Sequence, residues 1–389
     1  MPELPEAEAQ RRMLAKCVVG RRIASVDCRE QGGGGREGLF DDKVFAEGAD
    51  EAAVEAFLVG ATCVGARRRG KQLWLELERA GAARALLIHL GMTGSCVVRG
   101  EAVPQYKAFR VDEASWPPRF CKLELTLDDG ARVAYADPRR FGRLLLRDGD
   151  AAAAPPVSLL AADALTPPPA AAMAALLAKR HAPIKAVLLD QNAVVCGVGN
   201  WVCDDVLLAA RLHPATKASD LSDGDVARLR EAIVGVCETA CDANADSSAF
   251  PETWLFHHRW IKQTTGSVDT PIGRVHFDTI GGRTTAFIPS VQKKGGSTPA
   301  AKKKPAAKPA AESKAKPAAK KPAAKPAAES KAKPAAKKPA AKPAAESKAK
   351  PAAKKPAAAA KKAPKRAAKA EAEAKPPAKK ARPARKARK

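Results

Sequence analysis

The sequence predicts an α+β fold: a helix and a β-sandwich at the N-terminal end, a helical region after them, and then a β-hairpin and a basic tail. Three patterns predict this order. Residues 2–20 carry helix signals, and segments between residues 71 and 137 alternate polar and apolar side chains as strands do. Between residues 170 and 241 the apolar side chains follow helical spacing instead.

The N-terminal helix is expected over residues 2–20, "PELPEAEAQRRMLAKCVVG". Pro2 and Pro5 stand at its start, acidic residues fill its first turns and Gly20 ends it, which are the usual boundary signals of a helix. Short strands with a hairpin turn at "DDG" then indicate a sandwich. These strands are expected at "KQLWLELE" (71–78), "RALLIHLG" (84–91), "CKLELTLDDG" (121–130) and "ARVAYAD" (131–137).

The second half of the chain changes from a linker to helices and then to a hairpin. Residues 151–172 are rich in Ala and Pro, which predicts a linker or hinge. Helices are expected at "AAAMAALLAKRH", "APIKAVLLDQ", "WVCDDVLLAARL" and "LSDGDVARLREAIVGVCETAC", the last with Ser222 as its N-cap. A β-type stretch, "RVHFDTIGGRTTAFIPSVQ", follows. The expected divisions are the N-terminal helix and β-sandwich over residues 1–150, the linker over 151–172, the helical domain over 173–250, the hairpin over 251–292 and the tail over 293–389.

Charge separates the tail from the rest of the chain. Residues 293–389 carry 33 Lys and Arg against five Glu, whereas residues 1–292 carry 35 basic and 37 acidic side chains. The unit "KKPAAKPAAESKAKPAA" recurs in the tail and contains nothing to bury, so we expect disorder until the tail meets a polyanion. A solubilising tail without a partner is the alternative interpretation.

Cysteine spacing and hydropathy exclude several classes of protein. All nine cysteines lie within the first 241 residues at irregular intervals, and no CxxC occurs, which argues against a four-cysteine zinc site. We expect reduced thiols in an intracellular compartment. Apolar stretches are broken by Pro, Gly, His or charge, so neither a signal peptide nor a membrane-spanning segment is expected.

The first residues suggest covalent chemistry. Removal of Met1 would expose the secondary amine of Pro2 at a helix N-terminus, where the helix dipole disfavours its protonation. Such an amine attacks a carbonyl-like carbon to give an iminium. Glu3 and Glu6 stand beside it as proton donor and acceptor. Taken alone, a well-capped amphipathic helix is the favoured explanation of the same residues.

Three turns carry side chains suited to nucleic acid. Lys71 follows three arginines at the tip of an expected hairpin, where its cation would project toward phosphate. Met92, between two glycines in "HLGMTGS", would wedge into a base stack. "DPRRFG" (137–142) puts two guanidiniums and a phenyl ring on one turn, for phosphates, base edges and the space left by an extruded base. The alternatives are a solvated basic turn, a buried Met and an ion-paired surface hairpin.

Two glycine-containing turns follow in the second half. "CGVGNWVCDDVLLAARLHP" opens a helix whose first N–H groups, with Asn200, would bind a phosphate. A nucleotide-binding loop is the rival interpretation, which is disfavoured because the preceding "IKAVLLDQ" is typical of a helix and not of a strand. The hairpin "GGRTTAFIPSVQ" (281–292) presents Arg283.

Taken together and in this order, these motifs resemble the formamidopyrimidine-DNA glycosylase family over residues 2–292. The resemblance implies a helix after a free proline, a β-sandwich, and a helix–two-turn–helix domain with a β-hairpin finger. It also implies that Pro2 is the nucleophile and that Glu3 is the acid that assists sugar ring opening. Glu6 belongs to the same N-terminal motif of the family. Lys71 resembles the hairpin lysine that holds phosphate near the lesion.

The same resemblance assigns the DNA contacts. Met92, Arg139 and Phe141 resemble the three residues that fill the gap left by a flipped nucleotide, and Arg139 would face the orphaned base. Further residues match positions expected to bind phosphate or to lie near the lesion: Arg140, Lys185, Asn200 and Arg283.

Two departures from the family pattern stand out. Family members commonly carry a zinc finger of the form CxxC…CPxCQ, and here other residues occupy the four positions: Thr265, Val268, Ile288 and Val291. We therefore expect a finger without metal, similar to that of the plant-type branch. The segment "DQNAVVCGVGN" is also one residue longer than the usual spacing, which leaves the placement of Lys185 open.

The activity implied is that of a bifunctional DNA glycosylase and AP lyase of base excision repair. It would remove oxidised purines through an iminium on Pro2 without a cofactor, and residues 241–260 are too short to form the family's full cap over 8-oxoguanine. One alternative is an oxidised-pyrimidine glycosylase of the same superfamily, although "PELPE" favours the purine-directed branch. The other is a catalytically silent chromatin-architectural protein, against which Pro2, Glu3 and Lys71 argue.

The expected partners follow from the fold and the tail. The folded part would bind damaged double-stranded DNA as a monomer, and the tail, similar to that of a linker histone, would bind DNA or chromatin. "KKAPKR" and "KPPAKKARPARKARK" are typical of nuclear-localisation signals, so the nucleus is the expected location.

Overall fold

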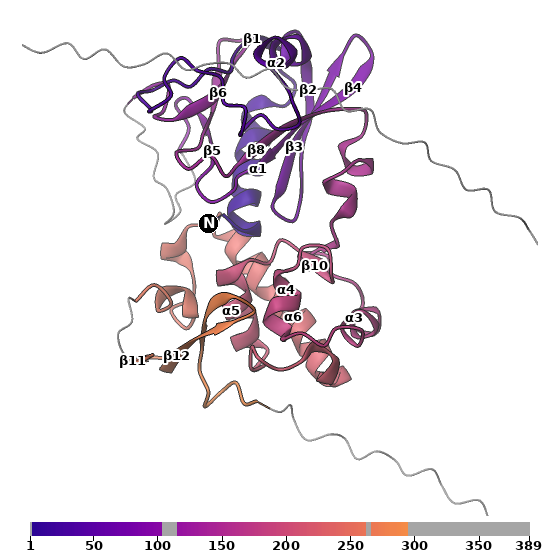
Figure 1. The fold of residues 1–389 in the computed structure, drawn as a ribbon, viewed down its shortest axis with the longest axis vertical. Helices are drawn as coiled ribbons and strands as arrows, with labels where there is room; N and C mark the ends of the chain where they lie inside the picture. Colours follow the sequence, from indigo (N-terminus) through magenta and orange to yellow (C-terminus); the bar gives the residue numbers. More distant parts are fainter. Residues whose placement is uncertain (1, 103–114, 262–265, 295–389) are drawn as a thin grey trace, which may run out of the picture. The chain divides into compact units, whose positions relative to one another are not determined.

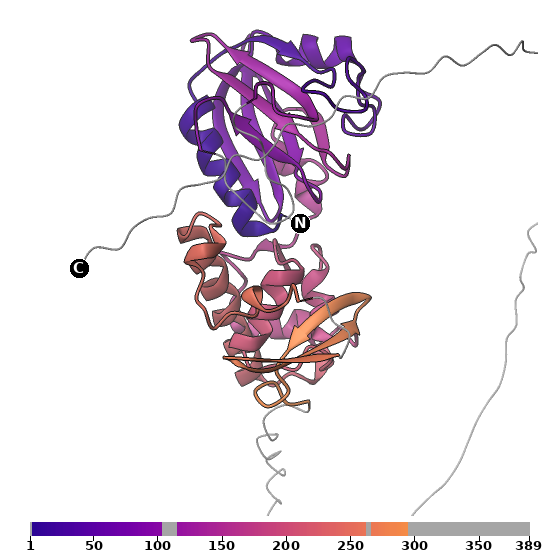
Figure 2. The same cartoon turned by 90° about the vertical axis from the view of Figure 1, so that its left-hand side faces the viewer.

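The computed structural model describes residues 2–102, 115–261 and 266–294 (Figures 1 and 2). Sheets, helices and a three-stranded finger follow one another within these residues, so the predicted α+β class is confirmed. The tail after Lys294 lies outside the described residues, and so does Thr265. In the described part of the chain, no helix combines the length and the apolar character needed to cross a bilayer.

The predicted N-terminal helix is confirmed as α1, which runs from Leu4 to Val18. Its first turn packs into the helical region, since Leu4 belongs to the core formed by the later helices. Further along, Leu14 and Val18 belong to the core of the sandwich, against which the indigo helix lies in Figure 2. One helix therefore contributes to both cores and connects them.

The sandwich consists of two four-stranded sheets in which every neighbouring pair is antiparallel. The first sheet has the order β1-β6-β7-β5, with the bounds Ile23–Asp27, Cys121–Leu127, Arg132–Ala136 and Ser95–Val98. The second has the order β2-β3-β4-β8, with the bounds Thr62–Arg69, Gln72–Arg79, Ala82–His89 and Arg143–Asp148. All four strands expected from alternation are present, as β3, β4, β6 and β7.

Several elements of the sandwich lack the alternating pattern. β2 ends in three arginines, and β5 is buried along its whole length of four residues, so neither shows a polar and an apolar face. β1, β8 and the short helix α2 (Glu51–Leu58) were likewise not expected. These elements form because each pairs with, or packs on, a neighbour that does carry the pattern.

The Ala/Pro-rich stretch expected as a linker carries short structure of its own. It contains the 3₁₀ turns η1 (Ala151–Ala153) and η2 (Val157–Leu159) and the strand β9 (Ala162–Asp163). β9 pairs in parallel with β10 (Val195–Cys196), which lies just before the glycine turn. Ala151 and Val157 are buried in a small core on the outer face of the second sheet.

The four predicted helices are confirmed as α3, α4, α5 and α6, which span Ala170–Leu177, Ile184–Leu189, Asn200–Ala209 and Asp223–Asp242. Ser222 caps α6 as expected: its hydroxyl accepts the Asp225 N–H at 3.2 Å, and the Asp225 carboxylate accepts the Ser222 N–H at 3.0 Å. Short connections, including η3 (Ala218–Asp220), join the helices around a shared core.

The β-type stretch near residue 280 is confirmed as a three-stranded antiparallel finger. Its strands are β11, β12 and β13, with the bounds Ser267–Thr270, Gly273–Ile280 and Arg283–Phe287. Two 3₁₀ turns precede it, η4 (Ser247–Ala249) and η5 (Leu255–His257). The finger packs on the helical region through a small core of its own that contains Leu255, Val275, Ala286 and Ile288.

Candidate active site

The chain enters α1 through Pro2 and Glu3, both of which are buried. The Glu6 carboxylate accepts the Glu3 N–H at 2.9 Å, as in a capping box. The Leu4 N–H donates to the Gly197 carbonyl at 3.2 Å, so the helical region also holds the start of the helix. Pro2 therefore has a defined place directly before α1, at the positive end of the helix dipole.

The Glu3 side chain spans from α1 to α5. Its two carboxylate oxygens accept the main-chain N–H groups of Trp201 and Val202, at 2.9 and 3.0 Å. These N–H groups lie in the first turn of α5, where no partner exists within the helix, so Glu3 caps α5 from another part of the chain. Because Glu3 already engages these two donors, they are not open to the phosphate that was expected at this turn.

The glycine turn before α5 is required by this close approach. A Cβ on Gly199 would lie 2.2 Å from the Glu3 Cδ, and one on Gly197 would lie 2.5 Å from the Leu4 Cδ1. Gly197 also has a φ of +103°, a conformation that side chains disfavour. The start of α1 thus packs directly against this turn. It occupies the space that would have to be open for a nucleotide if the turn were a nucleotide-binding loop.

Glu6 is the carboxyl whose protonation is most altered near Pro2. Burial, and next the negative charge of Glu3, raise the pKa of Glu6 to about 7. The indole N–H of Trp201 donates to Glu6 Oε1 at 3.1 Å, and the Glu3 N–H donates to the other oxygen. A carboxyl that titrates near neutrality is suited to accept and return a proton beside the Pro2 nitrogen.

Lys71 occupies the turn between β2 and β3 and is half-buried. Burial lowers the pKa of the Lys71 ammonium, the negative charges of Glu3 and Glu6 oppose that change, and the positive charge of Arg283 adds to it. The ammonium therefore interacts electrostatically with both glutamates and with the finger. The structure brings together all four residues expected to be catalytic: Pro2, Glu3, Glu6 and Lys71.

The β2–β3 turn is held against the helical region. The Gly70 N–H donates to the Asp163 carboxylate at 2.7 Å, and a Cβ on Gly70 would lie 2.8 Å from the Cys196 sulfur. Arg68 donates to Asp163 at 2.7 Å and to Glu8 of α1 at 3.1 Å. Because these ion pairs join β2 to β9 and to α1, the position of Lys71 relative to Pro2 is fixed.

The three side chains expected to fill a gap in DNA lie on two turns of the sandwich. Phe141 is 51% exposed, and the Arg139 guanidinium lies 5.1 Å from the centre of its ring. Met92 is half-buried in the turn between β4 and β5. A Cβ on Gly91 would lie 2.4 Å from the Gly142 nitrogen, so the two turns are in direct main-chain contact.

Two cations expected at the DNA interface are engaged within the protein. The Arg140 guanidinium donates to both oxygens of Asp41, at 2.7 and 2.8 Å. Lys185 is fully buried and lies 2.5 Å from the Asp204 carboxylate. A fully buried ammonium cannot reach a phosphate without a rearrangement, so Lys185 supports the interior in this structure.

Asn200 and Arg283 lie where the helical region meets the finger. The Asn200 amide donates to the Thr284 carbonyl at 3.0 Å, and its oxygen Oδ1 has no hydrogen-bond partner within the described residues. Arg283 begins β13 and is exposed.

Asp204 of α5 fixes the finger to the helical region. Its buried carboxylate accepts from Lys185, from Arg259 at 2.9 Å and from the Ala286 N–H of β13 at 3.1 Å. Two cations and a main-chain donor thus compensate one buried charge. The Lys185 ammonium also donates to the Thr284 carbonyl at 3.3 Å, which extends the same contact into the finger.

The end of the finger is held by an amide. Buried Gln292 accepts the Ile288 N–H at 2.8 Å and donates to the Leu212 carbonyl at 3.0 Å. Of the positions matched to the family's finger cysteines, Ile288 is buried in the finger core and Val268 lies in β11. Within the described ranges, no three His, Cys, Asp or Glu side chains are grouped as a metal site would require.

Two family descriptions match most of the residues that the structure describes. The formamidopyrimidine-DNA glycosylase N-terminal domain matches residues 1–144, and the H2TH domain of the same glycosylases matches residues 160–252. The formamidopyrimidine-DNA glycosylase of Arabidopsis thaliana is 36% identical over 294 residues, which cover 75% of this chain and 71% of the relative.

The chain belongs to the formamidopyrimidine-DNA glycosylase family.

Solved structures of this family share the fold. A crystal structure of the Lactococcus lactis glycosylase with DNA containing an abasic site is 25% identical and has a TM-score of 0.57, with 75% of this chain and 100% of that chain covered. The Thermus thermophilus enzyme is 28% identical and has a TM-score of 0.55, with 76% and 100% covered. Family and fold confirm the predicted function class, a DNA glycosylase of base excision repair.

Sequence reasoning missed three residues of this glycosylase whose contacts within the protein hold the site together. Trp201 donates to both glutamates, Asp163 holds the Lys71 turn, and Asp204 holds the finger. One signal was available: two adjacent aspartates stand in the apolar helix "NWVCDDVLLAA", and a buried carboxylate requires a partner. The identity of that partner was not readable, because Arg259 lies 55 residues away.

Proposed function

We propose that this glycosylase is bifunctional, and that it releases oxidised purines and cleaves the strand with the Pro2 nitrogen as nucleophile. The observation that carries the proposal is the place of Pro2, directly before α1 and next to Glu3, with Glu6 and Lys71 in the same group. Removal of Met1 would turn the Pro2 nitrogen into a secondary amine. The helix dipole and the nearby ammonium both favour its neutral, nucleophilic form.

Base release follows from attack on the anomeric carbon of a flipped nucleotide. The Pro2 nitrogen forms a bond to C1′ while the bond from C1′ to the base breaks, and the base leaves with the electron pair and takes up the proton that the Pro2 nitrogen gives up. Glu3 gives a proton to O4′ so that the sugar ring opens, which leaves an iminium between C1′ and Pro2. The hydrogen bonds of the Glu3 carboxylate to the N-terminus of α5 support this role, because they hold the carboxyl beside Pro2.

Strand cleavage follows from the acidity of the iminium. Loss of a proton from C2′ expels the 3′ phosphate, a second elimination expels the 5′ phosphate, and water then releases the sugar fragment from Pro2. The pKa of about 7 supports Glu6 as the proton acceptor. The ammonium of Lys71 would hold a phosphate of the damaged strand.

The DNA contacts are proposed for the exposed residues of the two turns and of the finger. Met92, Arg139 and Phe141 would fill the space left by the flipped nucleotide and so offset a flipping cost of a few kcal/mol. Asn200 and Arg283 would hold backbone phosphates: the Asn200 amide nitrogen donates one N–H to the Thr284 carbonyl and carries a second, and the Arg283 guanidinium is exposed. No cofactor enters this chemistry, and we propose that the enzyme acts as a monomer.

The tail is proposed to act in location and in general affinity. Residues 293–389 carry 33 basic side chains, a density that favours DNA or chromatin as partner and the nucleus as location. Its sequence signals of nuclear import stand at the opposite end of the chain from Pro2, whose amine must be free for the reaction.

The lesion preference is proposed from the segment before the finger. Phe250 and Phe256 are buried and lie 5.4 and 5.0 Å from the Trp201 ring, so the segment packs into the helical core. A segment used in this way offers few contacts to a flipped 8-oxoguanine. Missing pocket hydrogen bonds cost about one or two kcal/mol, or roughly ten-fold in discrimination.

Single-turnover kinetics on matched duplexes that differ in one lesion test this proposal. Formamidopyrimidines, hydantoins and abasic sites weaken stacking or pairing themselves, so we expect faster cleavage of these than of 8-oxoguanine opposite cytosine. The fastest cleavage at 8-oxoguanine would contradict our interpretation of residues 241–260. A preference for oxidised pyrimidines would favour the other branch of the superfamily, and the absence of cleavage on every lesion would favour a silent architectural protein.

A further inference from the structure

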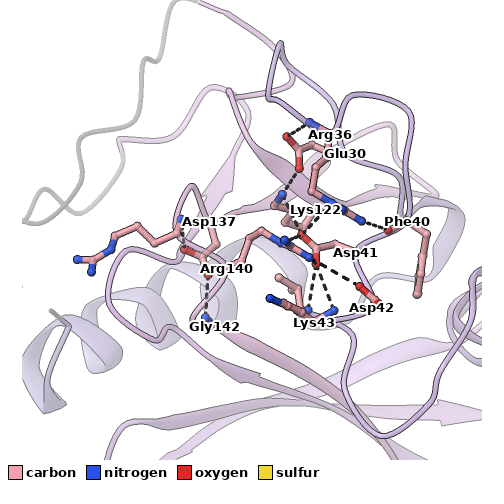
Figure 3. Close-up of polar contacts among 12 residues, drawn as sticks. Glu30, Arg36, Phe40, Asp41, Asp42, Lys43, Lys122, Asp137, Arg140 and Gly142 are labelled. Atoms are coloured by element: carbon pink, nitrogen blue, oxygen red, sulfur yellow. Dashed lines mark hydrogen bonds and ion pairs between the residues drawn. The ribbon is translucent and has the colours of Figure 1, made fainter.

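The turn that carries Arg139 and Phe141 is tied to the interior through the residue between them. Arg140 has a φ of +57°, a left-handed conformation that is unusual for a residue with a side chain. Its guanidinium donates to Asp41 through two parallel hydrogen bonds, which is the most directional pairing that a carboxylate accepts (Figure 3). The pair fixes the conformation of the turn at its centre.

Asp41 is fully buried and held from several sides. The Lys122 ammonium of β6 lies 3.1 Å from its carboxylate, and the Lys43 N–H donates to it at 3.2 Å. Lys122 is itself buried and also pairs with buried Glu30. In Figure 3 the Lys122 side chain of β6, the Arg140 side chain of the turn and the main chain at Lys43 converge on Asp41. Buried charges keep such an arrangement because separating any pair is costly.

Asp137 closes the other side of the same turn. Its carboxylate accepts the Gly142 N–H at 2.7 Å, the Arg139 N–H at 3.2 Å and the Thr93 hydroxyl at 2.7 Å. Thr93 directly follows Met92, so the turn of Met92 and the turn of Arg139 share this carboxylate. The main chain around Arg139 and Phe141 is thus held by Asp137 at its ends and by Asp41 at its middle.

We propose that Asp41 is a positioning residue that, by holding Arg140, directs Arg139 and Phe141 and thereby sets which base opposite the lesion is accepted. The inference rests on the proposed function of Arg139 and Phe141 at the orphaned base. A contact that discriminates between bases depends on the direction of the donor groups. Arg140, between the two, turns inward to Asp41, and its neighbours are thereby presented outward.

The test is single-turnover base release from one lesion placed opposite each of the four bases, with Asp41→Asn compared with the wild type. The variant keeps the size of the side chain and removes its charge, and we expect the preference among opposite bases to fall about ten-fold, the discrimination that one good base contact supplies. Cleavage of an abasic site should change far less. Asp42→Asn is the matched control, because the Asp42 side chain is 81% exposed and lies 3.7 Å from Arg140.

A second variant guards against a folding defect in Asp41→Asn. Arg140→Lys keeps a positive charge but loses the parallel pair, and it should narrow the same preference. An unchanged preference in Arg140→Lys, or a wild type that cuts equally opposite all four bases, would overturn the inference. A wild type that releases no base at all would instead overturn the proposed function.

Discussion

At the scale of single residues, the two glutamates of the first turn have different surroundings and so different chemistry. Glu3 accepts two main-chain N–H groups of α5, whereas Glu6 is buried next to the charge of Glu3 and has a pKa raised to about 7. Of these neighbouring carboxyls, Glu6 is therefore the one with a pKa near neutrality, which suits it to carry a proton. Trp201 connects them, because its main-chain N–H donates to Glu3 and its indole N–H to Glu6.

Replacing Trp201 by Phe should shift the pH dependence of cleavage. The indole N–H that donates to Glu6 stabilises its ionised form. The change removes this donor, so the pKa of Glu6 should rise. The charges facing Glu6 are those of Glu3, the N-terminal amine and Lys71, and they stay in place. If the ionised form of Glu6 is the active one, the acid limb of the single-turnover pH profile should move upward by about one unit.

The control for that shift is Trp254→Phe. Trp254 lies 6.1 Å from the Trp201 ring in the same aromatic group, and its replacement leaves the donor to Glu6 intact. An acid limb that stays in place in Trp201→Phe, or moves equally in both variants, would contradict the role given to the indole N–H.

At the scale of elements, the finger is held by charge and packing. Asp204 receives Lys185, Arg259 and the main chain of β13, and Gln292 holds the end of the hairpin. The sequence predicted the hairpin of β12 and β13 and the lack of cysteines in the finger, but not the strand β11. The two aspartates in an apolar helix indicated a buried carboxylate there, but not that Asp204 pairs with Lys185, Arg259 and β13.

Asp204→Asn should loosen the finger, and a chelator should not. The variant leaves Lys185 buried without its counter-charge, and breaking such a pair costs about 3–5 kcal/mol. Thermal unfolding and the affinity for lesion duplexes should both report the loss. Asp269→Asn is the control, because Asp269 is 86% exposed in β11.

Loss of activity in EDTA that zinc restores would contradict a finger without metal.

How much of the elements was predictable depends on how local their causes are. α1, α6 and the alternating strands β3, β4 and β6 carry their own pattern and caps, so their positions were predicted within a few residues. The charged strand β2 and the buried strand β5 form because of their neighbours in the sheet. Of the candidate site, the motifs identified Pro2, Glu3, Glu6 and Lys71. The ion pair of Arg140 with Asp41 and that of Lys185 with Asp204 could not be predicted without the fold.

At the scale of the whole molecule, α1 brings the candidate catalytic residues together by belonging to two cores. Leu4 is buried among the later helices, Leu14 is buried in the sandwich, and Arg68 links Glu8 of α1 to Asp163. The place of the Pro2 nitrogen therefore depends on contacts from both halves of residues 2–294, which no local sequence pattern could reveal.

Deleting residues 300–389 should separate affinity from chemistry. The tail holds most of the excess positive charge, so its loss should weaken duplex binding and flatten the dependence of the affinity on salt, because fewer counterions are released. Single-turnover base release at saturating enzyme should barely change. Cleavage that disappears with the tail would make the tail part of the catalytic unit.

The central claim is that the Pro2 nitrogen carries the reaction, and trapping with borohydride tests it most directly. Reduction during cleavage of a lesion duplex should leave a stable adduct of enzyme and DNA, and peptide mapping should place the adduct on residue 2 after loss of Met1. Pro2→Gly should abolish base release, and an N-terminal extension that blocks the nitrogen should prevent trapping. A fully active blocked enzyme, or an adduct on a lysine such as Lys71, would contradict the account.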